Sequence, residues 1–344
     1  MVDVGKPVVG QKPISGSAGI VTQLLALCGT GLFGLLIWRV GPRAIGEMLL
    51  SIGWSLPLVF LPHALVTALE SSGWWFALLQ RKRDSVRFQD IFRFTVSAKA
   101  VQLVTPSVAQ AGELLKVDLL RRTGASAATS VASVVCAKTT ITISELLFIG
   151  SGLAVALKRF PLEPYVMALT TVGLGLAALV MGGILLWQRS GLFRPLVLLA
   201  GKFRVLEWFV EQHHDILASV DGIVKNYLTQ WKRFGLSCLG YYLGWLAGAL
   251  EAWIFLALIG LPPLVLDALA IQLGLVIVTR LTAFMPGNLG THEAAILVIF
   301  SVLGFSPQAA MVFALLRRLR QIGWAAAGLG LLWRRPREAA VGAF

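Results

Sequence analysis

Charged side chains are scarce in this sequence: 14% of its 344 residues are charged, whereas 57% are hydrophobic. The mean hydropathy is +0.78. A soluble core of this length cannot bury so much apolar surface, so the composition predicts an integral membrane protein. The net charge of +13 does not indicate a nucleic-acid partner. Lys and Arg stand at the ends of apolar runs, where they orient helices in a bilayer.

Cysteine is also rare, and familiar catalytic motifs are missing. Cys28, Cys136 and Cys238 lie far apart inside apolar segments, so we expect neither a disulfide nor a metal site. The stretch HEAAI, from His292 to Ile296, begins like a zinc-protease helix but lacks the second histidine four residues later. There is no glycine-rich phosphate loop and no Ser–His–Asp pattern. We therefore predict a protein without a cofactor that is not an enzyme.

Long apolar runs define the expected fold class, an all-α polytopic membrane protein with one integral membrane domain over residues 1–344. Six runs are long enough to cross about 30 Å of hydrocarbon as helices: 20–38, 48–70, 127–157, 164–187, 235–259 and 308–333. Two more apolar regions, 91–120 and 264–303, are each interrupted by a proline near the middle. These regions are either re-entrant hairpins or pairs of kinked full crossings.

The distribution of Lys and Arg predicts the orientation of the chain. If both termini are cytoplasmic, the inside segments carry 18 of the 30 Lys and Arg residues and the outside segments carry four. The polar N-terminus, 1–19, has no secretory signal pattern, so we expect it to be retained. Segment 188–234 mixes apolar and charged residues at helical spacing and predicts amphipathic helices on the cytoplasmic membrane surface.

The two interrupted regions resemble each other when the sequence is shifted by 180 residues. Four identities appear in 33 positions, and Lys138 falls on Arg318. The identities are Pro106 with Pro286, Glu113 with Glu293, Gly124 with Gly304, and Ser126 with Ser306. With the predicted orientation the two regions enter the membrane from opposite sides. We therefore expect an inverted-topology repeat, 90–157 and 264–334, as in secondary transporters.

Each break is expected to direct a helix N-terminus toward the protein interior, because irregular backbone at membrane depth survives only in a polar or protein environment. Pro106 begins the first break. The second break is Pro286–Gly287–Asn288, where Asn288 is predicted to cap the following helix.

Several cations lie inside the apolar segments. Lys138, Arg317 and Arg318 are about ten residues, or roughly 15 Å, inside their helices, near the bilayer centre. The arginines of LLRRLRQ, which include Arg320, should line a polar cavity or pair with Glu113, Glu293, Glu145 or Glu251. For Arg93, Lys99 and Lys116 an interface-seeking side chain is at least as good an interpretation.

Buried cations and two helix N-termini together predict a site for an anion, here the phosphate of a lipid head group. Glu293 and His292 are candidates to carry a coupling proton. A purely structural ion pair is the alternative interpretation for Glu113 and Glu293.

Three stretches carry a resemblance to a known family: TPSVAQAGELLKVDLLRRTGAS, FMPGNLGTHEAAILVIFSVLG and ALLRRLRQ. They resemble the lysylphosphatidylglycerol synthase transmembrane-region family, also called flippase-like membrane proteins, and in particular its hopanoid-biosynthesis branch. The most specific pattern is Pro286, Gly287, Gly290 and Glu293. The resemblance implies lipid translocation, which in better-studied members concerns aminoacylated phosphatidylglycerol.

Together these observations predict a flippase-like lipid transporter of the bacterial inner membrane. Its partners would be membrane lipids as substrate and lipid-biosynthesis proteins, but no nucleic acid. Eleven residues follow the last predicted helix, so we expect no aminoacyl-transfer domain. The alternatives are a membrane-embedded transferase acting on a polyprenyl-phosphate or hopanoid lipid, and a non-catalytic scaffold. The predicted substrate-binding residues are Pro106, Glu113, Lys138, Pro286, Gly287, Asn288, Gly290, His292, Glu293, Arg317 and Arg318.

Overall fold

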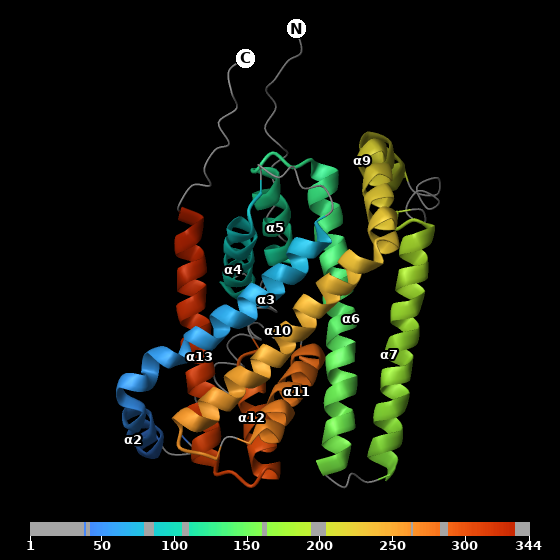
Figure 1. Ribbon diagram of the computed structural model, residues 1–344. Coiled ribbons are helices and arrows are strands. Elements are labelled where there is room, and N and C mark those ends of the chain that lie inside the picture. The colour runs from blue at the N-terminus through green and yellow to red at the C-terminus, as the bar shows by residue number, and fades with distance from the viewer. Residues whose placement is uncertain are drawn as a thin grey trace.

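The computed structural model describes residues 38, 42–78, 86–104, 110–159, 164–193, 204–262, 264–282 and 288–333. Within these ranges every regular element is a helix and no strand occurs, which confirms the all-α prediction (Figure 1). In chain order the elements are α2 (Pro42–Ile52), the 3-10 helix η1 (Gly53–Val59), α3 (Leu61–Ala77), α4 (Phe88–Val104), α5 (Ala111–Arg121), α6 (Ala127–Arg159), α7 (Pro164–Ser190), α9 (Arg204–Thr229), α10 (Trp231–Leu258), α11 (Val265–Leu281), α12 (Thr291–Val302) and α13 (Pro307–Trp333).

Four of the predicted spans are continuous helices, namely α6, α7, α10 and α13. Of these, α6, α7 and α10 contain stretches long and apolar enough to cross a membrane. The fourth, α13, carries three arginines near its middle. The span predicted at 20–38 lies outside the described residues, apart from Trp38. The long apolar helices are those of a multi-pass membrane protein.

The prediction of one continuous span at 48–70 is wrong. The chain there forms the end of α2, the whole of η1 and the start of α3. Gly53 has a φ of 52°, which ends the right-handed α2. Pro57 lies inside η1 and has no N–H to donate to a longer helix, and Pro62 stands in the first turn of α3. Apolar composition alone did not reveal these breaks.

Both proline-interrupted regions consist of two helices. The first is formed by α4 and α5, and the second by α11 and α12. Pro106, Pro286 and Gly287 fall between the helices of each pair, outside the described residues. Figure 1 shows α4 and α5 near the end of the bundle where α6 begins, whereas α11 and α12 lie near the end where α6 finishes.

The first helix of each pair packs on the long helix that follows the other pair in the chain. The pair α4–α5 precedes α6 in the chain, yet α4 packs along α13. In the same way α11, which precedes α13 in the chain, packs on α6. At the first crossing Ser97 donates a hydrogen bond of 3.1 Å to the Gly328 carbonyl, and at the second Leu273 packs on Gly152.

At the centre of the molecule α3 and α10 lie side by side over an extended contact (Figure 1). Glycines permit this approach. A Cβ at Gly240 would lie 2.8 Å from the backbone nitrogen of Gly73, and a Cβ at Gly73 would lie 2.6 Å from the Tyr241 ring. Small residues at such contacts let helix backbones pack closely in a membrane.

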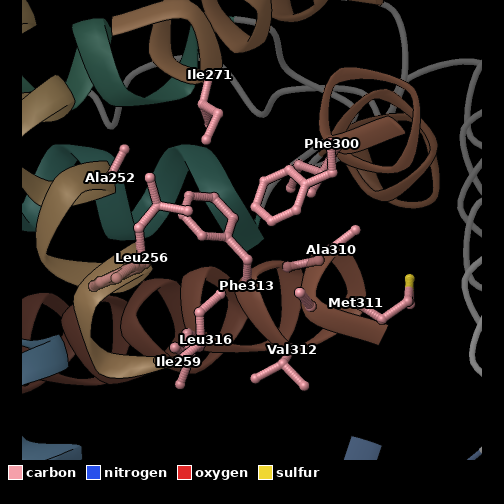
Figure 2. Packing of buried hydrophobic residues seen from close by; sticks show 14 of the residues in the cluster. Ala252, Leu256, Ile259, Ile271, Phe300, Ala310, Met311, Val312, Phe313 and Leu316 are labelled. Atoms are coloured by element: carbon pink, nitrogen blue, oxygen red, sulfur yellow. The ribbon is translucent and has the colours of Figure 1, made fainter. Parts of the chain in front are cut away.

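The buried apolar residues form two large clusters, which we call the first-half core, around Trp74, and the second-half core, around Phe300. In the second-half core the ring centroids of Phe300 on α12 and Phe313 on α13 lie 5.2 Å apart, and Leu256 of α10 joins them (Figure 2). In the first half Trp74 and Leu120 are fully buried, in a cluster built by α3, α4, α5, α6 and α9. Aromatic pairs of this kind add to the stability of a packed interface.

Helix α9 is amphipathic, as predicted for the segment 188–234. Val220, Val224 and Tyr227 are buried in the first-half core, where α9 packs on α6. Asp221 accepts hydrogen bonds from the N–H groups of Leu192 and Phe193 and so holds the end of α7. The position of α9 relative to the bilayer surface stays a prediction.

We expect Gly240→Val to destabilise the protein by about 1–3 kcal/mol, because the added side chain would collide with α3. The measurement is the thermal unfolding midpoint of the purified protein in detergent. Gly235→Val is the matched control, since it makes the same change in α10 where a Cβ meets nothing within 4 Å. Equal unfolding midpoints for the two variants would contradict the close contact of α10 with α3 at Gly240.

Candidate functional site

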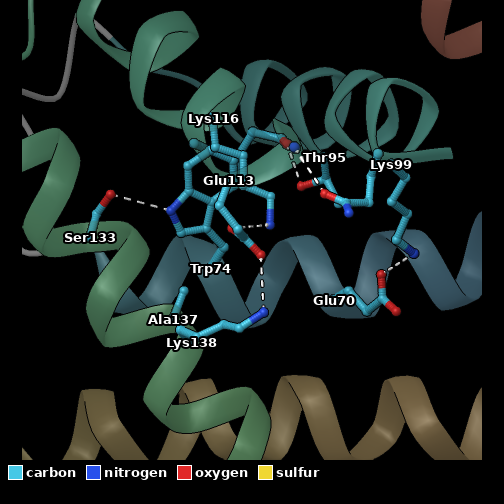
Figure 3. A network of polar contacts seen from close by, with 12 residues as sticks. Glu70, Trp74, Thr95, Lys99, Glu113, Lys116, Ser133, Ala137 and Lys138 are labelled. Carbon is cyan, nitrogen blue, oxygen red and sulfur yellow. Dashed lines mark hydrogen bonds and ion pairs between the residues drawn. The ribbon is translucent and has the colours of Figure 1, made fainter. Parts of the chain in front are cut away.

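In the first half a carboxylate faces two ammonium groups. Glu113 stands in the first turn of α5, and its Oε2 lies 3.1 Å from the Nζ of Lys116, one turn later (Figure 3). Its Oε1 lies 3.5 Å from the Nζ of Lys138 on α6. Lys138, which the sequence placed near the middle of its helix, therefore has a carboxylate partner. Lys116, interpreted above as interface-seeking, instead belongs to the same cluster.

The ring of Trp74 on α3 packs against this cluster on the side of Lys116. It is buried, and the Nζ of Lys116 lies 5.3 Å from its ring centroid, within the range of a cation–π interaction. Its Nε1 donates a 3.3 Å hydrogen bond to the Ser133 hydroxyl of α6 (Figure 3). An ion pair between Glu70 of α3 and Lys99 of α4 lies next to it.

The start of α5 is fixed against α4. The Gln102 side-chain oxygen accepts the N–H of Gly112 at 3.0 Å. A Cβ at position 112 would lie 2.6 Å from the Ala98 carbonyl, so only glycine allows the two helices to approach this closely. This contact places the adjacent Glu113 at the junction of α4, α5 and α6.

In the second half Glu293 forms the equivalent contact. Its Oε1 lies 2.6 Å from the Nε of Arg318 on α13. This is one of the pairings that the sequence left open for the arginines of LLRRLRQ. Arg318 also donates to the Asn288 carbonyl at 2.9 Å and to the Gln321 side chain at 2.8 Å. Charge-assisted bonds of this kind are strong, so Arg318 ties the turn before α12 to α13.

The prediction that Asn288 caps α12 is wrong. The N-cap residue is Gly290, with a φ of 76°, and no side chain caps the helix. Asn288 itself has a φ of 49°, and its side-chain oxygen accepts a hydrogen bond from Thr282 at the end of α11. The Asn288 side chain is therefore directed toward the end of α11 and does not cap α12.

His292 lies beside α11. Its Nε2 is 2.9 Å from the Thr279 hydroxyl, which donates its own proton to the Leu275 carbonyl. No contact with Glu293 or Arg318 is among those described for this imidazole, so its predicted role in a proton relay stays a prediction.

A third network, which the sequence analysis did not assign, joins three helices. His63 of α3 lies with its Nδ1 3.0 Å from Glu251 of α10 and 3.1 Å from the Nη1 of Arg320 on α13. Arg320 and Glu251 also form an ion pair. The spacing of three arginines in α13 was visible in the sequence, but nothing local could reveal that Arg320 would reach Glu251.

A fourth ion pair joins Glu145 of α6 and Arg280 of α11. By contrast, Arg317 has no hydrogen-bond or ion-pair partner in the part of the chain that the structure describes. Of the two predicted α13 arginines, the fold therefore brings Arg318 into a pair and leaves Arg317 without one among those residues.

The two equivalent ion pairs differ in accessibility. Side-chain exposure is 26% for Glu113 and 51% for Lys138, but 1% for Glu293 and 12% for Arg318. The first-half pair is open, and the second-half pair is enclosed by protein. Glu293 also keeps a buried oxygen, Oε2, without a hydrogen-bond partner among the described residues.

Other residues 180 positions apart also share local roles. Gly124 and Gly304, after α5 and α12, have φ values of 87° and 81°. Ser126 and Ser306 precede α6 and α13, and each hydroxyl accepts the N–H three residues later, at 3.1 and 3.2 Å. Three of the four identities found by shifting the sequence therefore mark equivalent positions in the helices, and the fourth, the proline pair, falls outside the described residues.

The model of a known protein family matches most of the chain. Its description is "Lysylphosphatidylglycerol synthase TM region", and it matches residues 20–330. The chain belongs to this family. Membership indicates a membrane protein related to lipid handling, whereas the hopanoid-associated branch stays a prediction. Searches of curated proteins and of solved structures found no match.

For the enclosed pair we expect Arg318→Met to destabilise this family member by about 3–5 kcal/mol, because Glu293 would be left buried and unpaired. The double variant Glu293→Gln/Arg318→Met should recover part of this loss. Both are measured as unfolding midpoints in detergent.

Arg122→Met provides the matched control for the arginine change. Arg122 forms an exposed pair with Asp118, so its loss should cost about 0–1 kcal/mol. A similar midpoint for Arg318→Met and Arg122→Met would mean that the buried pair contributes little.

Proposed function

We propose that this protein moves lipid head groups across the bilayer, using two re-entrant helix pairs related as inverted repeats. The family assignment supports a role in lipid handling. The observation that carries the proposal is a pair of half-exposed cations between the two helix pairs, Lys138 on α6 and Arg280 on α11.

The lengths of the short helices support re-entrant pairs. With 11 and 12 residues, α5 and α12 extend about 16–18 Å, well short of about 30 Å of hydrocarbon. The exchange of α6 and α13 between the pairs, and the equivalent positions of Glu113 and Glu293, agree with a two-fold relation of the halves. Transporters built in this way hold their substrate between the repeats.

The first cation, Lys138, is followed along α6 by Glu145, a buried carboxylate that pairs with the second cation, Arg280 of α11. Seven residues separate Lys138 and Glu145, so they share a helix face about 10 Å apart along the axis. Lys138 and Arg280 are each about half exposed, at 51% and 53%. A head group could thus contact the α4–α5 pair first and the α11–α12 pair next.

The openness of this face fits a lipid better than a soluble substrate. A half-exposed cation at the centre of a lipid-facing helix costs about 2.5–3.5 kcal/mol unless an anion or water reaches it. A lipid supplies a polar head group at this depth while its tails remain in the hydrocarbon. The corresponding crossing of α4 and α13 is closed by contact between Ala100 and Gly328, so the route is one-sided.

The difference between the open Glu113–Lys138 pair and the enclosed Glu293–Arg318 pair suggests how the halves alternate. If the repeats interconvert, opening of the second pair would accompany closure of the first. The predominance of Lys and Arg on the inside segments supports a bacterial inner-membrane location with both termini cytoplasmic.

The proposal is tested by reconstituting the purified protein in liposomes and following fluorescent anionic and neutral lipids side by side. Wild type should move at least one of them faster than empty liposomes, and Lys138→Gln should lower that rate at least about tenfold, the loss of one charge-assisted contact. Arg122→Gln, which changes an exposed ion pair at the end of α5, should retain the wild-type rate.

Rates equal to those of empty liposomes, across several head groups, would contradict the transporter. A transferase would instead modify a labelled lipid when given a donor. A scaffold would tolerate Lys138→Gln in cells, because this half-exposed lysine is not part of the enclosed ion pairs.

The inverted relation is tested with single cysteines in a variant whose native cysteines are replaced. Arg122→Cys and Val302→Cys place exposed thiols at the ends of α5 and α12. A membrane-impermeant maleimide should label position 302 in intact cells and position 122 only after the membrane is opened. Labelling of both from one side would refute the inverted repeat.

A further inference from the structure

The cluster of Glu113, Lys116 and Lys138 has more positive than negative charge. Glu113 meets both lysines, whereas Glu293 and Glu145 each form an ion pair with a single arginine. One elementary positive charge therefore remains uncompensated in the first-half cluster. We infer that this cluster binds the phosphate of an anionic phospholipid head group, an inference that rests on the proposed transport function.

The two lysines are held differently. Lys116 is fixed, since it lies on the Trp74 ring and 3.1 Å from Glu113, with a side-chain exposure of 17%. The Nζ of Lys138 is 3.5 Å from Glu113, longer than a good charge-assisted hydrogen bond, and its side chain is half exposed. Lys138 is thus free to turn toward a ligand while Lys116 stays in place.

The depth of the cluster matches a head group drawn into the membrane. Lys138 lies 11 residues after the first residue of α6, about 16 Å along the helix axis. An uncompensated charge at this depth is unfavourable in hydrocarbon, and a phosphate oxygen would neutralise it. The tails of the same lipid would remain in the bilayer beside the open face of α6.

Charge balance also selects among head groups. A phosphodiester with no cationic group brings one negative charge, which complements the cluster. A zwitterionic head group brings no net charge, and an aminoacylated head group adds an ammonium that the two lysines would repel. The site therefore favours phosphatidylglycerol-type lipids over phosphatidylcholine and over lysyl-phosphatidylglycerol.

The test is equilibrium binding of short-chain lipids to the full-length purified protein in a non-ionic detergent. The probes are dioctanoyl phosphatidylglycerol, phosphatidylcholine and lysyl-phosphatidylglycerol, with glycerol phosphate and inorganic phosphate as probes without tails. Phosphatidylglycerol should bind at least about tenfold more tightly than each of the others, equivalent to one charge-assisted contact.

Three variants separate a binding role from a structural one. Lys138→Gln should weaken phosphatidylglycerol binding about tenfold, whereas Lys138→Arg should keep it. Glu113→Gln leaves both lysines without their carboxylate and should tighten binding, the opposite of what loss of a structural ion pair would do. Arg122→Gln removes a charge from an exposed site near the end of α5 and should leave the affinity unchanged.

Equal affinities for phosphatidylglycerol and phosphatidylcholine, tighter binding of the lysyl lipid, or weaker binding by Glu113→Gln would overturn the inference. Binding of inorganic phosphate or glycerol phosphate as tight as that of the lipid would overturn the lipid assignment. The liposome assay separates the two proposals. Equal transport of anionic and neutral lipids would refute the inference but not the proposed function. Selective binding of phosphatidylglycerol without transport of any lipid would refute the proposed function but not the inference.

Discussion

A charge inside an apolar bilayer must be paired or must face a polar space, and the rest of this structure depends on that constraint. The described helices meet it with ion pairs that link segments far apart in the sequence. Glu293 with Arg318 joins α12 to α13, Glu145 with Arg280 joins α6 to α11, and Arg320 with Glu251 joins α13 to α10. These contacts fix the relative positions of helices that an apolar environment would otherwise let slide.

Close backbone approach makes these pairings geometrically attainable. Gly73 and Gly240 bring α3 and α10 together at the centre, and Gly112 lets α5 begin against α4. Carboxylates on short helices then reach cations on long ones. Hydrocarbon gives little driving force for helix association, so packing of small residues and polar contacts have to supply it together.

The ion pairs are not equivalent, and the difference connects structure to function. The pairs on α13 are enclosed, as expected for groups that hold the fold together. Each of the two pairs that involve α6 includes a half-exposed cation, Lys138 or Arg280, although Glu145 itself is buried. Polar groups that are exposed at membrane depth are unfavourable for stability alone, which is why we associate the face of α6 with a lipid head group.

The sequence by itself determined the membrane class, four of the long helices and the two interruptions, and it singled out Glu113 and Glu293 as matching positions. Which cation each of these carboxylates meets was decided by the tertiary structure. Apolar length and the 180-residue shift are properties of the chain that need no coordinates. Only the tertiary structure decided that 48–70 is broken, that Asn288 turns back toward Thr282, and that Arg320 meets His63. His63 and Arg320 are 257 residues apart, and such contacts depend on how helices cross, which local patterns do not encode.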